Sequence, residues 1–189
     1  GVPNLCLSDF IAPEASGQRD YVGLFAVTTG IGADEKSKEF ADQQDDYRSL
    51  MIKVLADRLA EAFAEYLHAR VRKETWGFDP DEDLRANDLL QAKYQGIRPA
   101  VGYPCCPNHQ DKIILFRILD PENRTGITLT ETGAMHPGAS VAGLYFAHPK
   151  SKYFQVGKIG IDQIKDYARR RGISVQQAEK QLATYLNYE

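Results

Sequence analysis

The longest regular pattern in the sequence is a run of apolar residues between positions 45 and 74. Apolar side chains recur there every three or four residues, which is the spacing of one face of an α-helix. They belong to Tyr47, Leu50, Met51, Val54, Leu55, Leu59, Ala62, Phe63, Tyr66 and Leu67. Alanines at positions 56, 60, 62 and 64 add helix propensity and allow close packing. We therefore expect one long amphipathic helix over 45–74, ended by Gly77 and Pro80.

Shorter strands and helices are expected before and after this helix in the sequence. Strands are expected where β-branched and aromatic residues gather, at 20–30 (ending in a loop at 28–34), 127–132, 139–148 and 152–159. The last two are joined by "PKS", which favours an antiparallel hairpin. Further helices are expected at 83–94 and after Asn108, which is a suitable N-cap residue.

The C-terminal part of the sequence predicts two more helices, at 161–171 and 174–186. Gly172 stops the first, and Ser174 with Gln177 forms a capping box for the second. Helices and antiparallel strands are mixed without regular βαβ alternation. The expected class is therefore α+β, with a bent antiparallel sheet flanked by helices.

Composition narrows the possible functions. The 189 residues suit one domain, and the formal net charge of −3 argues against nucleic acid, whose partners are normally basic. Three cysteines without framework spacing indicate reduced thiols and a cytoplasmic protein. We expect no membrane segment, because no apolar run approaches about 20 residues.

The segment "GIRPAVGYPCCPNHQ" at 96–110 is unusually stiff for a connecting loop. Pro99 restricts Arg98 to extended backbone angles, and Gly102 lets a backbone or a ligand approach closely. A guanidinium held in this way suits a planar carboxylate or phosphate. The residues alone leave a second interpretation open, in which the loop is a rigid connector and its arginine pairs with an acid elsewhere in the protein.

The sequence "RPAVGYP" resembles the signature of the activation domain of cobalamin-dependent methionine synthase. Segments 7–13, 45–77, 129–159 and 162–188 resemble further blocks of that family in the same order. The resemblance implies an S-adenosylmethionine site and a role in repair. In such enzymes, one electron from a flavodoxin-type reductase and a methyl group from the sulfonium return inactive cob(II)alamin to methylcobalamin. The cobalamin is held by a separate module.

The resemblance also implies which residues bind S-adenosylmethionine. Arg98 matches the arginine that takes the carboxylate, and Ala100, Gly102 and Tyr103 match loop positions that line the nucleoside. The remaining matches are Tyr153 and Phe154, an aromatic pair suited to a sulfonium cation, and Glu61 on the long helix. His68, on the same helix, is expected to be partly exposed.

Two departures from the family pattern stand out. Ala92 occupies a position, six residues before the loop arginine, where the family usually has a glutamate. The family domain also extends further at its N-terminus, where it contributes an acidic residue to the ligand side. We therefore expect residues 1–189 to form a single domain of this family that lacks the N-terminal part of the site.

Other functions remain open at this stage. The chain could be a stand-alone ligand-sensing or interaction module that kept the fold, or an independent S-adenosylmethionine-dependent methyltransferase with its own substrate. Cys105, Cys106 and His109 lie close in sequence, but adjacent cysteines are poorly placed to share one tetrahedral ion, so no metal site is expected. No residue suggests a general base or nucleophile. The family that the chain resembles is part of a methyltransferase, 5-methyltetrahydrofolate–homocysteine methyltransferase, and we expect the isolated domain to be catalytically silent.

Overall fold

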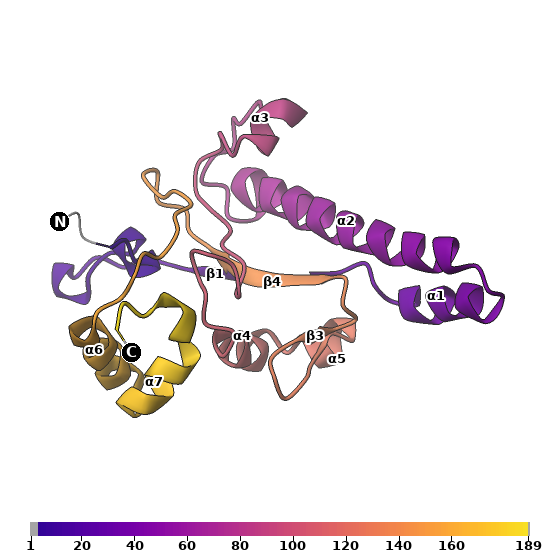
Figure 1. The fold of residues 1–189 in the computed structure, drawn as a ribbon. Coiled ribbons are helices and arrows are strands. Elements are labelled where there is room, and N and C mark those ends of the chain that lie inside the picture. Colours follow the sequence, from indigo (N-terminus) through magenta and orange to yellow (C-terminus); the bar gives the residue numbers. More distant parts are fainter. Residues whose placement is uncertain (1–3, 189) are drawn as a thin grey trace.

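A two-stranded antiparallel ribbon forms the centre of the protein (Figure 1). The structure is a computed structural model that describes residues 4–188. Strand β1 (Gly23–Thr28) pairs with β4 (Ser140–Tyr145), so that Gly23 faces Tyr145 and Thr28 faces Ser140. Helix α2 (Asp46–Arg70) covers one side of the ribbon, and α4 (Asp111–Leu119) covers the other. The expected α+β class, with antiparallel strands flanked by helices, is confirmed.

The long helix predicted at 45–74 is confirmed almost residue for residue. Helix α2 begins after Asp45, whose side chain accepts a hydrogen bond from the Arg48 amide at 2.9 Å. It continues through a π-helical turn (Val71–Thr75) and ends at Gly77, which has a left-handed φ of 69°. A good cap at one end and a glycine at the other explain why sequence located both ends.

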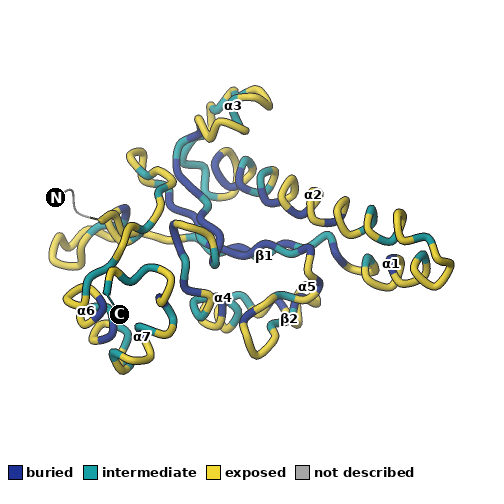
Figure 2. The backbone as a smooth tube through the Cα atoms, in the orientation of Figure 1, coloured by how far each residue is buried: buried dark blue, intermediate teal, exposed yellow. Residues whose placement is uncertain are grey.

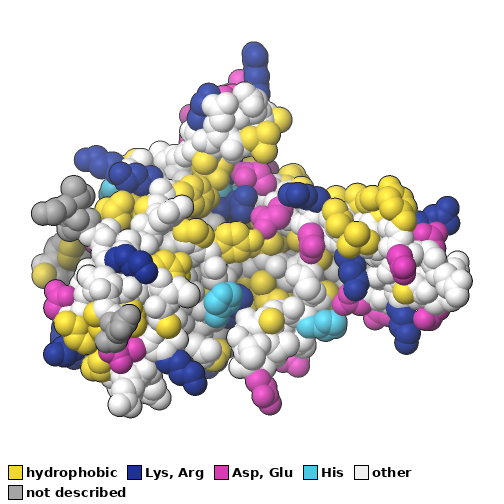
Figure 3. Space-filling model, in the orientation of Figure 1, with side chains coloured by type: hydrophobic (Ala, Val, Ile, Leu, Met, Phe, Trp, Pro, Cys, Tyr) yellow, Lys and Arg dark blue, Asp and Glu magenta, His cyan; other side chains and the backbone are white. Residues whose placement is uncertain are grey.

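The face that α2 buries is not the face that the sequence predicted. Ala56, Ala60 and Ala64 point into the core, whereas Leu59 remains 58% exposed and Tyr66 60% exposed. Figure 2 shows the outer side of α2 in yellow along its length, and Figure 3 shows hydrophobic side chains gathered there. The column of alanines brings the helix backbone close to the ribbon, so larger side chains have no room beneath it. The expected apolar stripe therefore lies mostly at the surface.

The segment at 152–159 is not the strand that its alternating pattern predicted. The backbone N–H of Phe154 donates to the sulfur of Cys105 at 3.1 Å, and the Cys105 thiol donates to the Phe154 carbonyl at 2.9 Å. Both backbone groups are thus satisfied by one side chain, and only Ile159 makes an isolated bridge, to Leu186. The hairpin expected between 139–148 and 152–159 is absent for this reason.

Several shorter elements differ from the prediction in extent. Part of the loop expected at 28–34 already belongs to α1 (Ala33–Asp42), and the helix expected at 83–94 is reduced to α3 (Ala86–Leu90). A short helix, α5 (Pro121–Thr125), precedes a second two-stranded sheet. In that sheet, β2 (Thr128–Leu129) pairs with β3 (Met135–His136).

The C-terminal helices form a small unit with its own apolar cluster. They are α6 (Ile161–Arg171) and α7 (Val175–Gln181), followed by a 3-10 turn (Ala183–Tyr185). The predicted capping box is confirmed, because Ser174 accepts from the Gln177 amide at 3.1 Å and Gln177 accepts from the Ser174 amide at 3.0 Å. An ion pair of 2.7 Å between Arg171 and Asp111 ties α6 to α4. None of the helices within residues 4–188 is both long and apolar enough to span a bilayer.

Candidate functional site

A groove with a volume of about 640 Å³ opens near the C-terminal end of α2. This volume is within the range of small-molecule sites. The groove is bounded by α2, the end of α3, the loop that follows it and the segment around Tyr153. Its walls are formed by Glu61, Glu65, Leu89, Leu90, Ala92, Tyr94, Arg98, Pro99, Ala100, Tyr103, Pro104, Cys105, Tyr153, Phe154 and Gln155.

The loop that carries Arg98 is docked on strand β4 like a short extra strand. The Val101 amide donates to the Ala142 carbonyl at 3.0 Å, and the Leu144 amide donates to the Pro99 carbonyl at 3.1 Å. Gly143 makes this approach possible, because a Cβ at its position would lie 2.8 Å from the Ala100 Cα. The prolines and these backbone contacts together hold the loop in one conformation, as the sequence suggested.

Arg98 extends into the groove and is paired with a glutamate of α2. Its Nη2 donates to Oε2 of Glu65 at 2.8 Å, and its side chain is 16% exposed against 25% for Glu65. Burial by itself would lower the pKa of Arg98, but the hydrogen bond and the charge of Glu65 outweigh it and raise the pKa. The Nε of Arg98 is buried and has no hydrogen-bond partner. The structure thus pairs this arginine with a protein acid, as the second interpretation of the sequence expected, and the pair lies in the wall of a groove.

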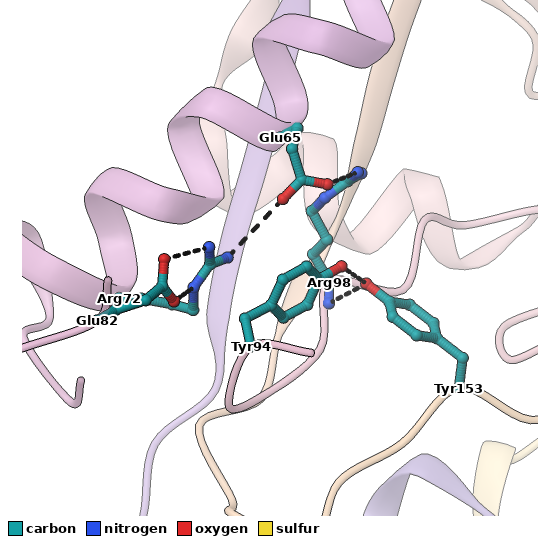
Figure 4. Close-up of polar contacts among 6 residues, drawn as sticks. All are labelled: Glu65, Arg72, Glu82, Tyr94, Arg98 and Tyr153. Atoms are coloured by element: carbon teal, nitrogen blue, oxygen red, sulfur yellow. Dashed lines mark hydrogen bonds and ion pairs between the residues drawn. The ribbon is translucent and has the colours of Figure 1, made fainter. Parts of the chain in front are cut away.

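A second arginine lies on the other side of Glu65 from the first (Figure 4). Arg72 is fully buried, and its Nε and Nη2 donate to the two oxygens of Glu82, the second at 2.9 Å. Its Nη1 lies 4.0 Å from Oε1 of Glu65, and neither of these two atoms has a hydrogen-bond partner. Glu65 therefore lies between two guanidinium groups and is bonded to only one.

Tyrosines complete the floor of the groove. The hydroxyl oxygen of Tyr153 accepts from the Arg98 backbone amide at 3.0 Å and is 3.1 Å from the hydroxyl of Tyr94. Burial, followed by the neighbouring Tyr153, raises the pKa of Tyr94, so its hydroxyl stays protonated. The Arg72 guanidinium stacks 4.2 Å from the centroid of the Tyr94 ring. These contacts hold the Arg98 backbone and the Arg72 guanidinium in place.

His68 lies beneath this cluster and is completely buried, so the expectation that it would be partly exposed is wrong. Its ring stacks on Tyr145 at 5.2 Å and meets the edge of Tyr94 at 4.9 Å. Burial first, and then the charges of Arg72 and Arg98, lower its pKa to about 2. The imidazole is therefore neutral and acts as a packing group at neutral pH.

The structure brings most of the predicted site residues together. Six of them line the groove, namely Arg98, Ala100, Tyr103, Tyr153, Phe154 and Glu61. The Tyr103 hydroxyl donates to Oε1 of Glu61 at 3.1 Å, which connects the loop to α2. Gly102 lies in the same loop but not in the groove wall; its φ is 101°, and a Cβ at its position would lie 2.6 Å from Cε1 of His109. Whether these residues bind a ligand stays a prediction.

Among the groove residues that sequence reasoning missed, Glu65 and Tyr94 make the polar contacts described above. Glu65 lies four residues after Glu61, one helical turn further along the same face, and this spacing was the available signal. Tyr94 offered no such signal, since its role depends on contacts with Tyr153 and Arg72. Ala92 does line the groove, so the carboxylate expected there in the family is replaced by a methyl group.

The cysteines next to the groove have separate structural roles. Cys105 bonds to Phe154, whereas the Cys106 thiol lies 3.8 Å from Oδ2 of Asp111. Burial, followed by the charge of Asp111, raises the pKa of Cys106 to about 12, so the thiol remains protonated, whereas metals bind thiolates. Within residues 4–188, no cluster of three or more His, Cys, Asp or Glu side chains is arranged to hold a metal ion.

The groove therefore offers one fixed guanidinium, two helix carboxylates one turn apart and the exposed rings of Tyr103 and Tyr153. This set matches a ligand that carries an anionic group, a cationic group and a flat apolar part. An arginine with a free, buried Nε is suited to a carboxylate.

Two comparisons with known proteins found matches over most of the chain. The sequence profile of the family described as "Vitamin B12 dependent methionine synthase, activation domain" matches residues 1–172. A solved structure, described as the crystal structure of the MetH reactivation domain bound to AdoHcy, superposes with a TM-score of 0.93 at 55% sequence identity. The match covers 97% of this chain and 57% of that chain. The chain thus spans a little over half of the length of the solved relative.

Proposed function

Since the chain belongs to the family of activation domains of vitamin B12-dependent methionine synthases, we propose that its groove binds S-adenosylmethionine and directs the methyl group toward cobalamin. The cobalamin would be held by a separate module of methionine synthase. Residues 1–189 would act as one domain in this role. The observation that carries the proposal is the single guanidinium, held by a docked loop, in a groove of suitable size.

The chemistry of the groove fits this ligand. AdoHcy, which the solved relative binds, has the same amino-acid tail and adenosine as S-adenosylmethionine and lacks only the transferred methyl group. The ligand carboxylate would bind Arg98, whose Nε has no hydrogen-bond partner. The ammonium group would lie toward the carboxylate of Glu61.

The remaining predicted residues would hold the other parts of the ligand. Tyr153 and Phe154 line one wall and offer aromatic surface to the sulfonium cation. Ala100 and the exposed ring of Tyr103 would contact the nucleoside, and Gly102 would let the loop backbone take the required turn. No acid or base is needed from the protein, because a sulfonium methyl group transfers without proton movement.

The groove residues would therefore bind and orient the ligand and leave its sulfur open to the neighbouring module. When bound there, cobalamin supplies the metal centre that takes up one electron and the methyl group. The electron would come from a flavodoxin-type reductase. In this way the domain would return inactive cob(II)alamin to methylcobalamin by reductive methylation.

The binding step is tested by titration calorimetry with S-adenosylmethionine. Arg98→Ala removes a charge-assisted contact worth about 1.5–3 kcal/mol, so affinity should fall roughly 10- to 150-fold. Arg70→Ala is the matched control, because Arg70 is an exposed arginine of α2 paired only with Glu74. No binding by the wild type, or an equal loss in both variants, would contradict the proposal.

The repair step is tested in intact methionine synthase that carries the same substitutions. The enzyme is oxidised, then supplied with S-adenosylmethionine and a flavodoxin-type reductant, and the return of methylcobalamin is followed by absorbance. Arg98→Ala should slow this recovery and leave turnover of the active enzyme unchanged. Unaltered recovery, with weakened binding, would show that the groove serves another purpose.

A further inference from the structure

A residue of the protein itself already occupies the position on Arg98 where the ligand carboxylate would bind. Glu65 places Oε2 2.8 Å from Nη2 of Arg98, inside the groove that would receive the ligand. Three of the polar atoms around this pair are buried without hydrogen bonds, namely Glu65 Oε1, Arg98 Nε and Arg72 Nη1. Buried polar atoms normally have hydrogen-bond partners. In the ligand-free domain these three atoms have none and could therefore form new hydrogen bonds.

Arg72 is positioned to accept the Glu65 carboxylate as an ion-pair partner. Glu82 uses Nε and Nη2 of Arg72, and the remaining Nη1 points at Oε1 of Glu65 from 4.0 Å. A shift of about 1 Å by the end of a glutamate side chain would bring this pair to hydrogen-bond distance. Because Arg72 is fully buried and held by Glu82, it would stay in place while Glu65 moves.

Resting on the proposed function, we propose that Glu65 is an internal substitute for the ligand carboxylate and is exchanged between the two arginines. In the free domain Glu65 neutralises Arg98. When the carboxylate of an α-amino acid ligand binds Arg98, Glu65 turns to Nη1 of Arg72. Glu65 is thus a specificity-determining residue, since only a ligand with its own carboxylate can replace it.

Electrostatics favours exchange over sharing. If Glu65 and the ligand carboxylate both stayed at Nη2 of Arg98, two like charges would lie a few ångströms apart at one largely buried nitrogen, which is unfavourable at low exposure. Leaving Arg98 without an anion would cost the desolvation of a buried cation. Exchange keeps an anion at Arg98 and moves Glu65 to Nη1 of Arg72, the nitrogen that Glu82 leaves without a hydrogen bond.

Titration calorimetry with two probes tests the exchange. The probes are S-adenosylmethionine and its decarboxylated analogue, and the variant is Glu65→Gln. Removing the internal competitor should tighten binding of S-adenosylmethionine about tenfold, or about 1.4 kcal/mol, and leave binding of the analogue unchanged. Glu74→Gln, which removes an exposed glutamate paired with Arg70, should change neither affinity.

The outcomes separate this inference from the proposed function. A wild type that binds S-adenosylmethionine, together with no gain or a loss in Glu65→Gln, overturns the exchange alone. An equal gain for both probes also overturns it, since the effect would not depend on the carboxylate. Absence of binding in both wild type and variant overturns the proposed function and the exchange together.

Two further measurements keep the test decisive if Glu65→Gln folds poorly. Glu65→Asp withdraws the carboxylate from Arg98 by one methylene group and should give a smaller gain in the same direction. A crystal structure of the complex should show Glu65 within about 3 Å of Arg72 Nη1 and released from Arg98. Glu65 still bonded to Arg98 in that complex would refute the exchange.

Discussion

The buried imidazole of His68 makes the stability of the domain dependent on pH. The folded protein holds the pKa of His68 at about 2, compared with 6.5 for a free histidine. In the unfolded chain His68 takes up a proton below pH 6.5, whereas in the folded domain it stays neutral until the pH is close to 2. Unfolding is therefore favoured by acid.

The magnitude follows from the two pKa values. Stability from this group is fully present above pH 6.5 and falls as the pH drops below that value toward the folded pKa. One pH unit in this window corresponds to about 1.4 kcal/mol. Lowering the pH from 7 to 5 should therefore reduce the free energy of unfolding by about 2 kcal/mol, through His68 alone.

Urea unfolding at pH 7, 6 and 5 measures this loss. His68→Phe keeps an aromatic ring of similar size against Tyr145 and Tyr94 but cannot be protonated. Between pH 7 and 5, the free energy of unfolding should fall in both proteins, and the fall in His68→Phe should be about 2 kcal/mol smaller than in the wild type. His148→Asn, at an exposed histidine, should retain the wild-type slope. Equal slopes for the wild type and His68→Phe would refute the reasoning.

Four other substitutions test the packing of the protein by thermal or urea unfolding, and Gly143→Ala is also tested by ligand binding. Ala64→Leu should destabilise the domain by about 1–3 kcal/mol because Ala64 is fully buried against the ribbon, whereas Leu59→Gln on the exposed face should change stability by less than about 0.5 kcal/mol. The reverse order would contradict the orientation of α2. Gly143→Ala should destabilise the protein and weaken ligand binding, since its Cβ would push the Arg98 loop off β4; wild-type affinity would refute this. Ser174→Ala should cost about 1 kcal/mol through loss of the α7 cap, and no cost would contradict the capping box.

Features that depend on neighbours in sequence were the ones that sequence predicted well. The ends of α2 and the start of α7 are set by Asp45, Gly77 and Ser174, whose effects reach only a few residues. The rigid loop around Arg98 was predicted for the same reason, because proline acts on its own backbone and on the preceding residue.

Features that depend on distant partners were missed or wrong. Periodicity identified the large apolar residues of α2, but the distance between helix and ribbon selects the alanine column for burial. The alternation at 152–159 was real, yet Cys105 satisfies the backbone of Phe154 from far away in the sequence. Local pattern cannot show which of two apolar faces has a partner.

The candidate site shows the same division. Arg98 was identified from its loop, whereas the pairing with Glu65 joins residues 33 positions apart and required the fold. The burial of His68 likewise depends on Tyr94 and Tyr145, which come from other segments.

The central claim is that the Arg98 guanidinium recognises the carboxylate of the ligand. It is tested most directly by measuring four affinities, those of the wild type and Arg98→Ala for S-adenosylmethionine and for its decarboxylated analogue. The wild type should bind S-adenosylmethionine at least about tenfold more tightly than the analogue, and Arg98→Ala should bind the two alike. If Arg98→Ala keeps the full preference for S-adenosylmethionine over the analogue, another group binds the carboxylate, and the account is contradicted.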